Sequence, residues 1–383
     1  MNRLKGMVYE GIGWLASLGP RSSSGRKKML IIRVDEIGDY MLWHRFLGEL
    51  TKADKFKDHE VHFIGNQSWK ALFNQFDAAS AWVSHTWWMD KIRFKKEMGY
   101  RLGLLKKIYR ENYDIVINPT FSRDKRYDDS IVTAARARER IGMVANQESI
   151  HPYEIGYDKN LYTRLFHHPE KPIFEFLRNR LFTEFVTGHP SSIQNTLVDP
   201  ALLPAPKQGL PEKYFVVFPG SRSAARIWPT HYFNRVSQYL HETHGWTPVV
   251  AGTRSDETYT NAFCENSHTP VTNLTGQTNL PDMLTLLKNA QCLISVDTGS
   301  IHLAAAVGGT VFGIFNGSQY KRFAPYPESL ASHVYPIYPD TIEKELQNPE
   351  LVLQKYEFVV PISYASVPPE KVILTIHQHF SPK

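Results

Sequence analysis

The amino-acid sequence predicts an α/β protein with two doubly wound, Rossmann-like domains, and three observations support this fold class. The chain has 383 residues, of which 42% are apolar, and this length is too great for one hydrophobic core. Short apolar runs rich in β-branched residues alternate with stretches of helical periodicity, as in proteins with parallel sheets. A turn-rich passage with five prolines at residues 188–211 separates the two halves and is typical of an interdomain linker.

The expected elements repeat the order strand, turn, helix in both halves. In the first half, strands are expected at residues 29–34, 61–65 and 113–117, with helices near 69–76 and 99–109. In the second half, strands are expected at residues 214–218, 248–252, 292–296 and 310–315, with a helix at 229–241. These elements predict a basic N-terminal arm (1–28), a first domain (29–205), a second domain (206–360) and a C-terminal helix (361–383) that packs back on the first domain.

The net charge of +6 is unevenly distributed along the chain. Residues 1–150 hold 26 Lys and Arg against 18 Asp and Glu, a net charge of +8, whereas residues 151–383 carry a net charge of −2. This asymmetry indicates an anionic partner for the first half. A phosphorylated lipid or glycan would be attracted to this positive charge. The absence of a zinc finger or an RNA-binding signature disfavours nucleic acid as the partner.

Compartment and membrane signals are weak. Two cysteines, Cys264 and Cys292, are too few for a disulfide framework and favour a reducing, cytoplasmic setting. No stretch approaches the ~20 apolar residues of a membrane-spanning helix, and no cleavage site follows the apolar residues 11–16. The arm carries Trp14 and the basic run 26–28, which permit two interpretations: contact with anionic lipid at the inner membrane surface, or a solvated tail.

The turn at residues 297–302 is the first candidate site, because it follows an expected strand and leads into a helix of small residues. Amides at a helix N-terminus, together with the helix dipole, bind phosphate. Gly299 allows the backbone to approach a ligand, and His302 lies just inside the helix. The alternative is an ordinary capped turn with Asp297 or Thr298 as the cap.

Two further turns carry polar groups between a strand and a helix. Residues 219–229 offer hydroxyls, two arginines and Gly220 to a diphosphate, with Arg226 placed to neutralise the leaving group. The alternative is a solvated basic loop in which Trp228 and Pro229 only staple the helix start. Residues 35–39 hold three carboxylates, of which Asp39 is a candidate general base and Asp35 and Glu36 are alternatives; each is also a candidate N-cap.

Other chemistry receives little support. The histidines have no spacing typical of a metal site, so no metal is expected, and no nucleophile elbow is present. Trp82, Trp87 and Trp88 are interpreted as aromatic core or, alternatively, as the lining of an acceptor groove.

Taken together, the three turns resemble glycosyltransferase family 9, the heptosyltransferases of lipopolysaccharide core assembly. The resemblance rests on the order and spacing of residues 31–39, 218–229 and 295–305, with residues 315–318 as a further match. It implies a fold of the glycosyltransferase B (GT-B) type, in which the C-terminal half binds an ADP-sugar, usually ADP-heptose. It also implies inverting catalysis without a metal or a cofactor, on a cell-envelope acceptor.

The resemblance also implies roles for individual residues. Asp39 matches the base that deprotonates the acceptor hydroxyl, and Arg226 matches a lysine whose charge stabilises the departing ADP. The remaining matches concern the donor: phosphate contacts at Ser221 and Arg222; ribose contacts at Asp256 or Glu257; adenine contacts at Thr278; and the donor-binding loop with Asp297, Thr298, Gly299, Ser300 and His302.

The chain departs from the family pattern in three places. Arginine replaces lysine at position 226, residues 40–44 are bulkier than usual, and residues 1–28 are extra. The bulk at 40–44 suggests an unusual acceptor, whose choice we expect to depend on residues 122–188. Two other functions remain open at this point: a UDP-sugar-dependent transferase or epimerase of the same fold, and a non-catalytic nucleotide-sugar-binding protein.

Overall fold

The computed structural model describes residues 3–22, 25–145, 158–169, 172–331 and 333–381, and the chain divides into two compact units. The first unit comprises residues 1–170 and 176–193, and the second comprises residues 171–175 and 194–383. The boundary lies before the expected position at 205–206, because the linker bonds to the second unit. The Val198 amide donates to the Ala306 carbonyl at 2.9 Å, and the Thr285 hydroxyl donates to the Pro204 carbonyl at 2.8 Å.

The first unit is built on a six-stranded parallel sheet with the strand order β3-β2-β1-β4-β5-β6. Its strands are β1 (Lys27–Arg33), β2 (His59–Asn66), β3 (His85–Met89), β4 (Ile115–Asn118), β5 (Glu139–Met143) and β6 (Arg164–Phe166). Its helices are α1 (Arg3–Ala16), α2 (Ile37–Met41), α3 (Phe46–Lys52), α4 (Lys70–Phe76), α5 (Lys91–Lys96), α6 (Met98–Arg110), α7 (Asp128–Ala135), α8 (Asp158–Leu161) and α9 (Glu175–Thr187).

Alternation along β1 shows how the first sheet is covered on both faces. Leu30 and Ile32 point into a core shared with α1, α5, α6 and α7. The odd-numbered residues, including Arg33, point to the opposite face, where Arg33 contacts Asn179 of α9. Burial on both faces explains why β1 is an almost continuous apolar run. Trp87 and Trp88 lie on β3 and are half-buried, and Trp88 packs edge-on against Trp69 with ring centroids 5.6 Å apart.

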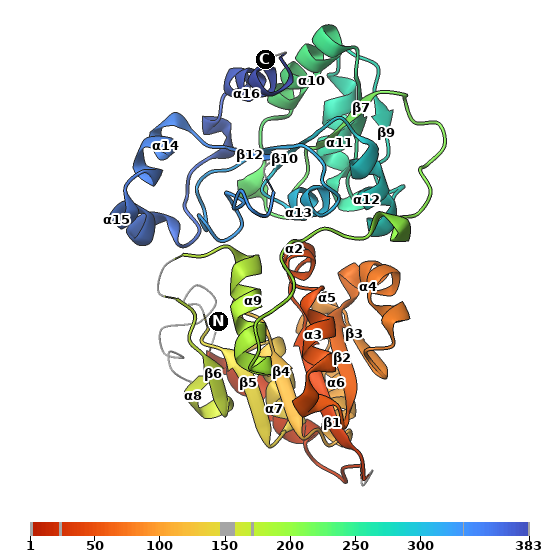
Figure 1. Ribbon diagram of the computed structural model, residues 1–383, viewed down its shortest axis with the longest axis vertical. Helices are drawn as coiled ribbons and strands as arrows, with labels where there is room; N and C mark the ends of the chain where they lie inside the picture. The colour runs from red at the N-terminus through yellow and green to blue at the C-terminus, as the bar shows by residue number, and fades with distance from the viewer. Residues whose placement is uncertain (1–2, 23–24, 146–157, 170–171, 332, 382–383) are drawn as a thin grey trace. The chain divides into compact units, whose positions relative to one another are not determined.

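The second unit is built on another six-stranded parallel sheet, with the order β12-β11-β10-β7-β8-β9. Its strands are β7 (Tyr214–Phe218), β8 (Thr247–Val250), β9 (Thr272–Asn273), β10 (Leu293–Val296), β11 (Val311–Ile314) and β12 (Val334–Ile337). Its helices are α10 (Thr230–His244), α11 (Glu257–Glu265), α12 (Leu280–Asn289), α13 (Gly299–Ala306), α14 (Asp340–Leu346), α15 (Pro349–Leu351) and α16 (Pro369–Phe380). Helices α10, α11 and α16 share a core with one face of the sheet, and α12 and α13 lie on the other face (Figure 1).

The C-terminal helix packs on the second unit, which corrects the expectation that residues 361–383 return to the first domain. Val372 and Ile376 of α16 are fully buried in the core formed with α10 and the sheet. Phe380 adds an edge-on contact with Trp246 at 5.0 Å between ring centroids. The apolar face of α16 is therefore already covered by the domain that precedes it in sequence. The N-terminal arm also differs from a solvated tail, because α1 packs on α6 and α7.

Both sheets have the doubly wound strand order in which the chain reverses direction between the first and fourth strands. In the first unit that switch point lies between β1 and β4, and in the second it lies between β7 and β10. Ligands of such folds bind outside the carboxyl ends of these strands. Residues 35–39 follow β1, whereas residues 219–229 and 297–298 follow β7 and β10, so all three predicted turns lie at switch points. No helix in the described part of the chain is long and apolar enough to cross a bilayer.

Candidate functional site

The two predicted donor loops of the second unit are in direct contact. Strands β7 and β10 are neighbours, with Phe218 paired to Ser295, so the loops that follow them start side by side. Arg226 Nη1 donates to the Asp297 carbonyl at 3.3 Å and lies 3.7 Å from the Asp297 carboxylate. Two residues predicted separately, 71 positions apart, are thus brought together at the switch point.

Helix α13 begins at this point, and within its first turn the Ile301 amide donates to the Thr298 carbonyl at 3.2 Å. Thr298 is the N-cap residue in an extended conformation, and its side chain makes no capping hydrogen bond. The first amides of a helix have no partner within the helix, and the dipole favours an anion there. The Ser300 hydroxyl lies 2.8 Å from the hydroxyls of both Ser295 and Thr298. Ser300 therefore fixes the turn from within, while Thr298 and Gly299 are only half-buried.

Asp297 is a buried carboxylate whose main cationic neighbour is Arg226. Burial raises the pKa of Asp297 above its usual value, and the Arg226 guanidinium partly offsets this shift. The side chain of Arg226 remains about one third exposed. The same guanidinium that holds Asp297 is therefore open to a second, external anion.

The loop that carries Arg226 is anchored at one end and exposed at the other. Trp228 is fully buried, and its indole N–H donates to the Val367 carbonyl at 2.9 Å. Arg222 is exposed, and Ser221 is half-buried with its hydroxyl accepting from the Ser223 amide at 3.3 Å. Gly220 leaves space for Asp256, because a Cβ at position 220 would lie 2.4 Å from Asp256 Oδ1. Gly220 is thus required by packing rather than by its backbone conformation.

His302 lies inside α13 and is nearly inaccessible to solvent. Its Nδ1 lies 2.6 Å from the Tyr326 hydroxyl. Burial lowers the pKa of His302 to about 4, and the nearby Glu175 carboxylate opposes this shift only in part. The imidazole is neutral near pH 7, so any contact with a phosphate or a sugar is a neutral hydrogen bond and not an ion pair.

The depressed pKa of His302 predicts acid sensitivity of the fold. In the unfolded chain an ordinary histidine takes up a proton below about pH 6.5, whereas His302 in the fold does so only near pH 4. Its contribution to stability is therefore complete above pH 6.5 and is lost as the pH falls to 4, by about 3 kcal/mol at most. We expect His302→Gln to reduce the loss of thermal stability between pH 7 and pH 5. The exposed control His231→Gln should leave that loss unchanged, and an unchanged loss in both variants would contradict the assignment.

The two carboxylates proposed for ribose have different surroundings. Asp256 is buried and closes a capping box, in which the Thr253 amide and hydroxyl both donate to Asp256 Oδ2 at 2.8 and 2.7 Å. Glu257 is exposed at the first position of α11. Hydrogen bonds from Thr253 therefore occupy the Asp256 carboxylate, whereas the exposed Glu257 carboxylate is accessible to a ligand.

This difference predicts opposite phenotypes for the two carboxylates. Glu257→Gln should weaken ADP binding by on the order of tenfold, the value of one hydrogen bond to a charged group, without changing stability. Asp256→Asn should instead lower the free energy of unfolding by about 1 kcal/mol through the lost cap. Titration calorimetry with ADP and thermal unfolding distinguish the two effects. Equal ADP affinities of wild type and Glu257→Gln would exclude Glu257 from the ribose site.

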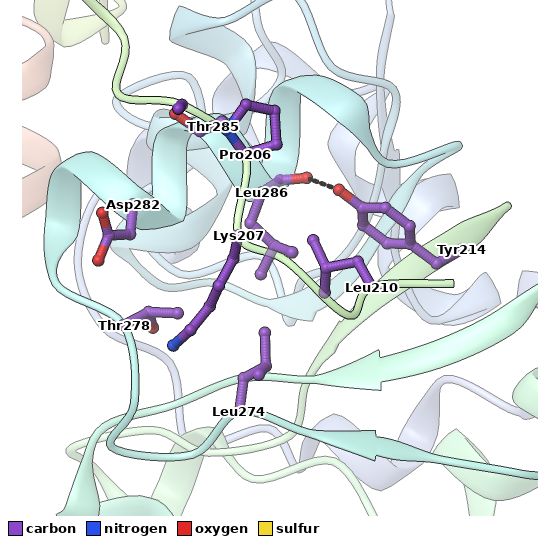
Figure 2. A pocket seen from close by; sticks show the side chains of 10 residues that line it. Pro206, Lys207, Leu210, Tyr214, Leu274, Thr278, Asp282, Thr285 and Leu286 are labelled. Carbon is purple, nitrogen blue, oxygen red and sulfur yellow. Dashed lines mark hydrogen bonds between the residues drawn. The ribbon is translucent and has the colours of Figure 1, made fainter. Parts of the chain in front are cut away.

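Thr278 lies beside a small cavity formed partly by the linker. This cavity has a volume of about 110 Å³ and is lined by linker residues, by residues of α12, and by Leu274 and Tyr214. Figure 2 shows Thr278 and Asp282 at one side of it. Lys207 of the linker donates to the Gln277 carbonyl, and the Tyr214 hydroxyl donates to the Leu286 carbonyl at 2.9 Å. Pockets that enclose drug-sized ligands are typically 300–1,000 Å³, so this cavity is too small to enclose a nucleotide. The linker contribution to this region was not expected from the sequence.

In the first unit, Asp39 lies on α2, and buried polar contacts hold the turn that precedes it. Arg33 has no exposed surface; its Nη2 donates to the Asp39 carbonyl at 3.0 Å, and its Nη1 donates to the Pro119 carbonyl at 2.6 Å. The Trp69 indole N–H and the Asn66 amide donate to the Asp35 carbonyl at 3.0 and 2.9 Å. The position of Asp39 is therefore fixed from β1, from the loop after β4 and from the end of β2.

The three carboxylates of this turn are not equivalent. Asp35 forms an ion pair with Arg33 at 3.0 Å, and Glu36 forms one with Lys91 at 2.8 Å. Asp39 is half-buried on the helix itself. The sequence alone did not identify Arg33 and Lys91; a buried arginine at the end of an apolar strand is the signal that would have indicated the first.

The bulky residues after Asp39 face the protein interior. Tyr40, Trp43 and His44 are all buried, and the Tyr40 hydroxyl donates to the Asp77 carboxylate. Tyr40 also stacks on Trp69, with ring centroids 4.1 Å apart. Their bulk therefore fills the core and does not by itself indicate an unusual acceptor. Within the region 122–188, expected to choose the acceptor, residues 146–157 and 170–171 lie outside the described ranges.

The fold and the switch-point turns define a protein with two nucleotide-binding-type α/β units, and comparisons with known proteins narrow this class. The family model for glycosyltransferase family 9 (heptosyltransferase) matches residues 101–352, more than half of the chain. The chain therefore belongs to glycosyltransferase family 9, which confirms the resemblance found in its sequence.

Curated relatives agree with this assignment over part of their length. Lipopolysaccharide heptosyltransferase 3 of Escherichia coli (strain K12) is 25% identical over 235 residues, which cover 60% of this chain and 66% of that protein. Lipopolysaccharide core heptosyltransferase OpsX of Haemophilus influenzae is 25% identical over 142 residues, which cover 36% of this chain and 39% of that protein. The matched regions thus span less than two thirds of each of these relatives.

Solved structures confirm the fold over nearly the whole chain. A glycosyl transferase of family 9 from Veillonella parvula DSM 2008 matches with a TM-score of 0.66 at 16% identity, covering 92% of this chain and 97% of that one. The E. coli heptosyltransferase WaaC with ADP-2-deoxy-2-fluoro heptose matches with a TM-score of 0.64 at 17% identity, covering 92% and 99%. The two doubly wound units are therefore those of the GT-B fold, as the sequence predicted.

Proposed function

We propose that this chain is an inverting, metal-independent glycosyltransferase that moves a heptose, or a similar sugar, from an ADP-sugar to a lipopolysaccharide-core or related envelope glycan. The observation that carries the proposal is the contact of Arg226 with Asp297 beside the N-terminus of α13. It joins a cation and helix amides at one switch point, where a diphosphate is stabilised best. The relatives' names, and the ADP-heptose analogue named with WaaC, support ADP-heptose as the donor.

In the proposed reaction, the Asp39 carboxylate accepts the proton of the acceptor hydroxyl. The hydroxyl oxygen forms a bond to the anomeric carbon while the bond from that carbon to the diphosphate oxygen breaks, with inversion at the carbon. ADP leaves with the electron pair, and Arg226 and the α13 amides stabilise its new charge. Asp39 is preferred for the role of base because it is the carboxylate on α2 itself, at the position where the family resemblance implies the base.

The acceptor side of the proposal rests on charge. Residues 1–150 carry a net charge of +8, which favours an anionic, phosphorylated glycan as the substrate of the first unit. Such an acceptor is linked to lipid, so we place the protein in the cytoplasm at the inner face of the cytoplasmic membrane.

Nucleotide release tests this function directly. The full chain is incubated with ADP-heptose or with UDP-sugars, in the presence and absence of a detergent-solubilised core-glycan extract. We expect ADP release only when ADP-heptose and extract are both present, together with a gain of one heptose mass by the acceptor. Release of UDP would favour the UDP-sugar alternative. Tight ADP binding without any release would favour a nucleotide-sugar-binding protein.

A further inference from the structure

The N-terminal helix α1 has two apolar faces, and the first unit covers only one. On the inner face, the Tyr9 hydroxyl donates to the Lys95 carbonyl at 3.1 Å, and its ring lies 4.3 Å from the guanidinium carbon of Arg101. Ile12 and Ala16 are buried in the core of the first unit. Helix α1 is therefore a fixed part of the domain, and its other face has a defined position on the surface.

The outer face of α1 exposes large apolar side chains. Val8, Trp14, Leu15 and Leu18 are 45%, 60%, 44% and 51% exposed. The amides of Ser17 and Leu18 bond to the carbonyls of Trp14 and Leu15, which continues the helical turn to Leu18. Positions 8, 15 and 18 follow helical spacing and lie on one side, with Trp14 beside them. We call these four residues the α1 patch.

The segment that follows the α1 patch is hydrogen-bonded to the backbone of two exposed arginines, Arg110 and Arg136. The Ser22 amide donates to the Arg110 carbonyl at 2.7 Å, and Arg21 donates to the Arg136 carbonyl at 3.4 Å. The side chains of Arg110 and Arg136 are exposed. The segment that follows the patch is thus bonded directly to two residues whose guanidinium groups face solvent.

An exposed apolar cluster next to cations fits one kind of surface. A helix of this kind lies in the plane of a bilayer interface, with its apolar side chains among the acyl chains and its basic residues at the headgroups. Tryptophan is enriched at headgroup level, and juxtaposed arginines are attracted to anionic lipid. A protein partner would also cover apolar residues, but the exposed arginines bonded to the segment after the patch favour an anionic surface.

We propose that the α1 patch, together with Arg110 and Arg136, docks the first unit onto an anionic lipid bilayer. The inference deepens the proposed function, since it names the surface through which the protein meets the membrane that holds the acceptor. The docking itself requires neither donor nor acceptor.

Vesicle co-sedimentation of the full chain tests the proposal. Neutral vesicles consist of phosphatidylcholine alone, and anionic vesicles contain about 30% phosphatidylglycerol as well. We expect binding to the anionic vesicles that weakens with salt, and little binding to the neutral ones. Trp14→Ser/Leu18→Ser should weaken binding by on the order of tenfold or more, because two apolar side chains lose their burial. Arg110→Gln/Arg136→Gln should also weaken it by on the order of tenfold and flatten its salt dependence.

A matched control replaces equally exposed apolar residues elsewhere. Ile92 and Leu374 are 68% and 55% exposed on α5 and α16, so Ile92→Ser/Leu374→Ser should leave vesicle binding unchanged. All variants should unfold at the wild-type temperature, since only exposed side chains change. Equal binding by wild type and Trp14→Ser/Leu18→Ser, or equal binding to neutral and anionic vesicles, would overturn the proposal. Self-association that the same double variant abolishes would assign the patch to a second copy instead.

The result of the vesicle-binding experiment does not depend on whether the chain is a transferase. In detergent with solubilised acceptor, Trp14→Ser/Leu18→Ser should release ADP at the wild-type rate if the proposed function holds. Wild-type protein that binds anionic vesicles but releases no ADP would refute the transferase and leave the docking surface intact.

Discussion

Asp39→Asn should abolish sugar transfer while leaving the affinity for ADP-heptose nearly unchanged. The substitution removes the carboxylate that we propose as the base for the acceptor hydroxyl, and general-base catalysis contributes roughly 10²–10⁴ in rate. The backbone around position 39 should keep its path, because the Arg33 guanidinium donates to the backbone carbonyl of Asp39, which the substitution leaves in place. The residues proposed to bind the donor lie in the second unit, so we expect binding of ADP-heptose to have no direct need of the Asp39 carboxylate.

Single-turnover ADP release and calorimetric titration with ADP-heptose separate these two effects. Asp58→Asn is a suitable control, because Asp58 is an exposed carboxylate of the same unit, and its activity should equal that of wild type. Full activity in Asp39→Asn would refute the assigned base. An inactive protein that has also lost donor affinity would point to a folding defect, which thermal unfolding would reveal.

Arg226→Ala should reduce both turnover and affinity for ADP. Loss of a donor that stabilises charge in the transition state costs about 10²–10³ in kcat. The affinity for ADP should fall by on the order of tenfold, through the lost charged hydrogen bond to diphosphate. The variant also removes the cation that partly offsets the burial of Asp297, so the pKa of that carboxyl should rise further.

Two further variants make the Arg226 prediction specific. Arg226→Lys keeps the charge and restores the residue that the family resemblance implies at this position, so it should retain most of the turnover. Arg235→Ala removes an exposed arginine of α10 that pairs with Glu370 at 2.8 Å, and its kinetics should match those of wild type. Unchanged turnover and ADP affinity in Arg226→Ala would exclude this residue from leaving-group stabilisation.

The sequence by itself determined the fold class and the place of the three turns. Strand β7 spans the predicted residues 214–218, and the buried runs at β1, β10 and β11 begin and end within about two residues of their predicted limits. These strands are buried on both faces of a parallel sheet, so their signal is local and continuous in sequence. Because ligands of doubly wound sheets meet the strands' carboxyl ends, the local pattern also located the turns after β1, β7 and β10.

Only the tertiary structure decided which side chains of those turns meet and which face inward. The contact of Arg226 with Asp297 depends on β7 and β10 being neighbours, which is a property of strand order and not of either segment. The same holds for Asp256, which is buried under its own capping box while Glu257 is exposed, although the two are adjacent in sequence. Helix α16 likewise has an apolar face that any domain could cover, and its contacts with α10 and the second sheet settle which one does. Hydrophobic periodicity in the sequence indicates which residues are buried. Long-range packing determines which element buries them.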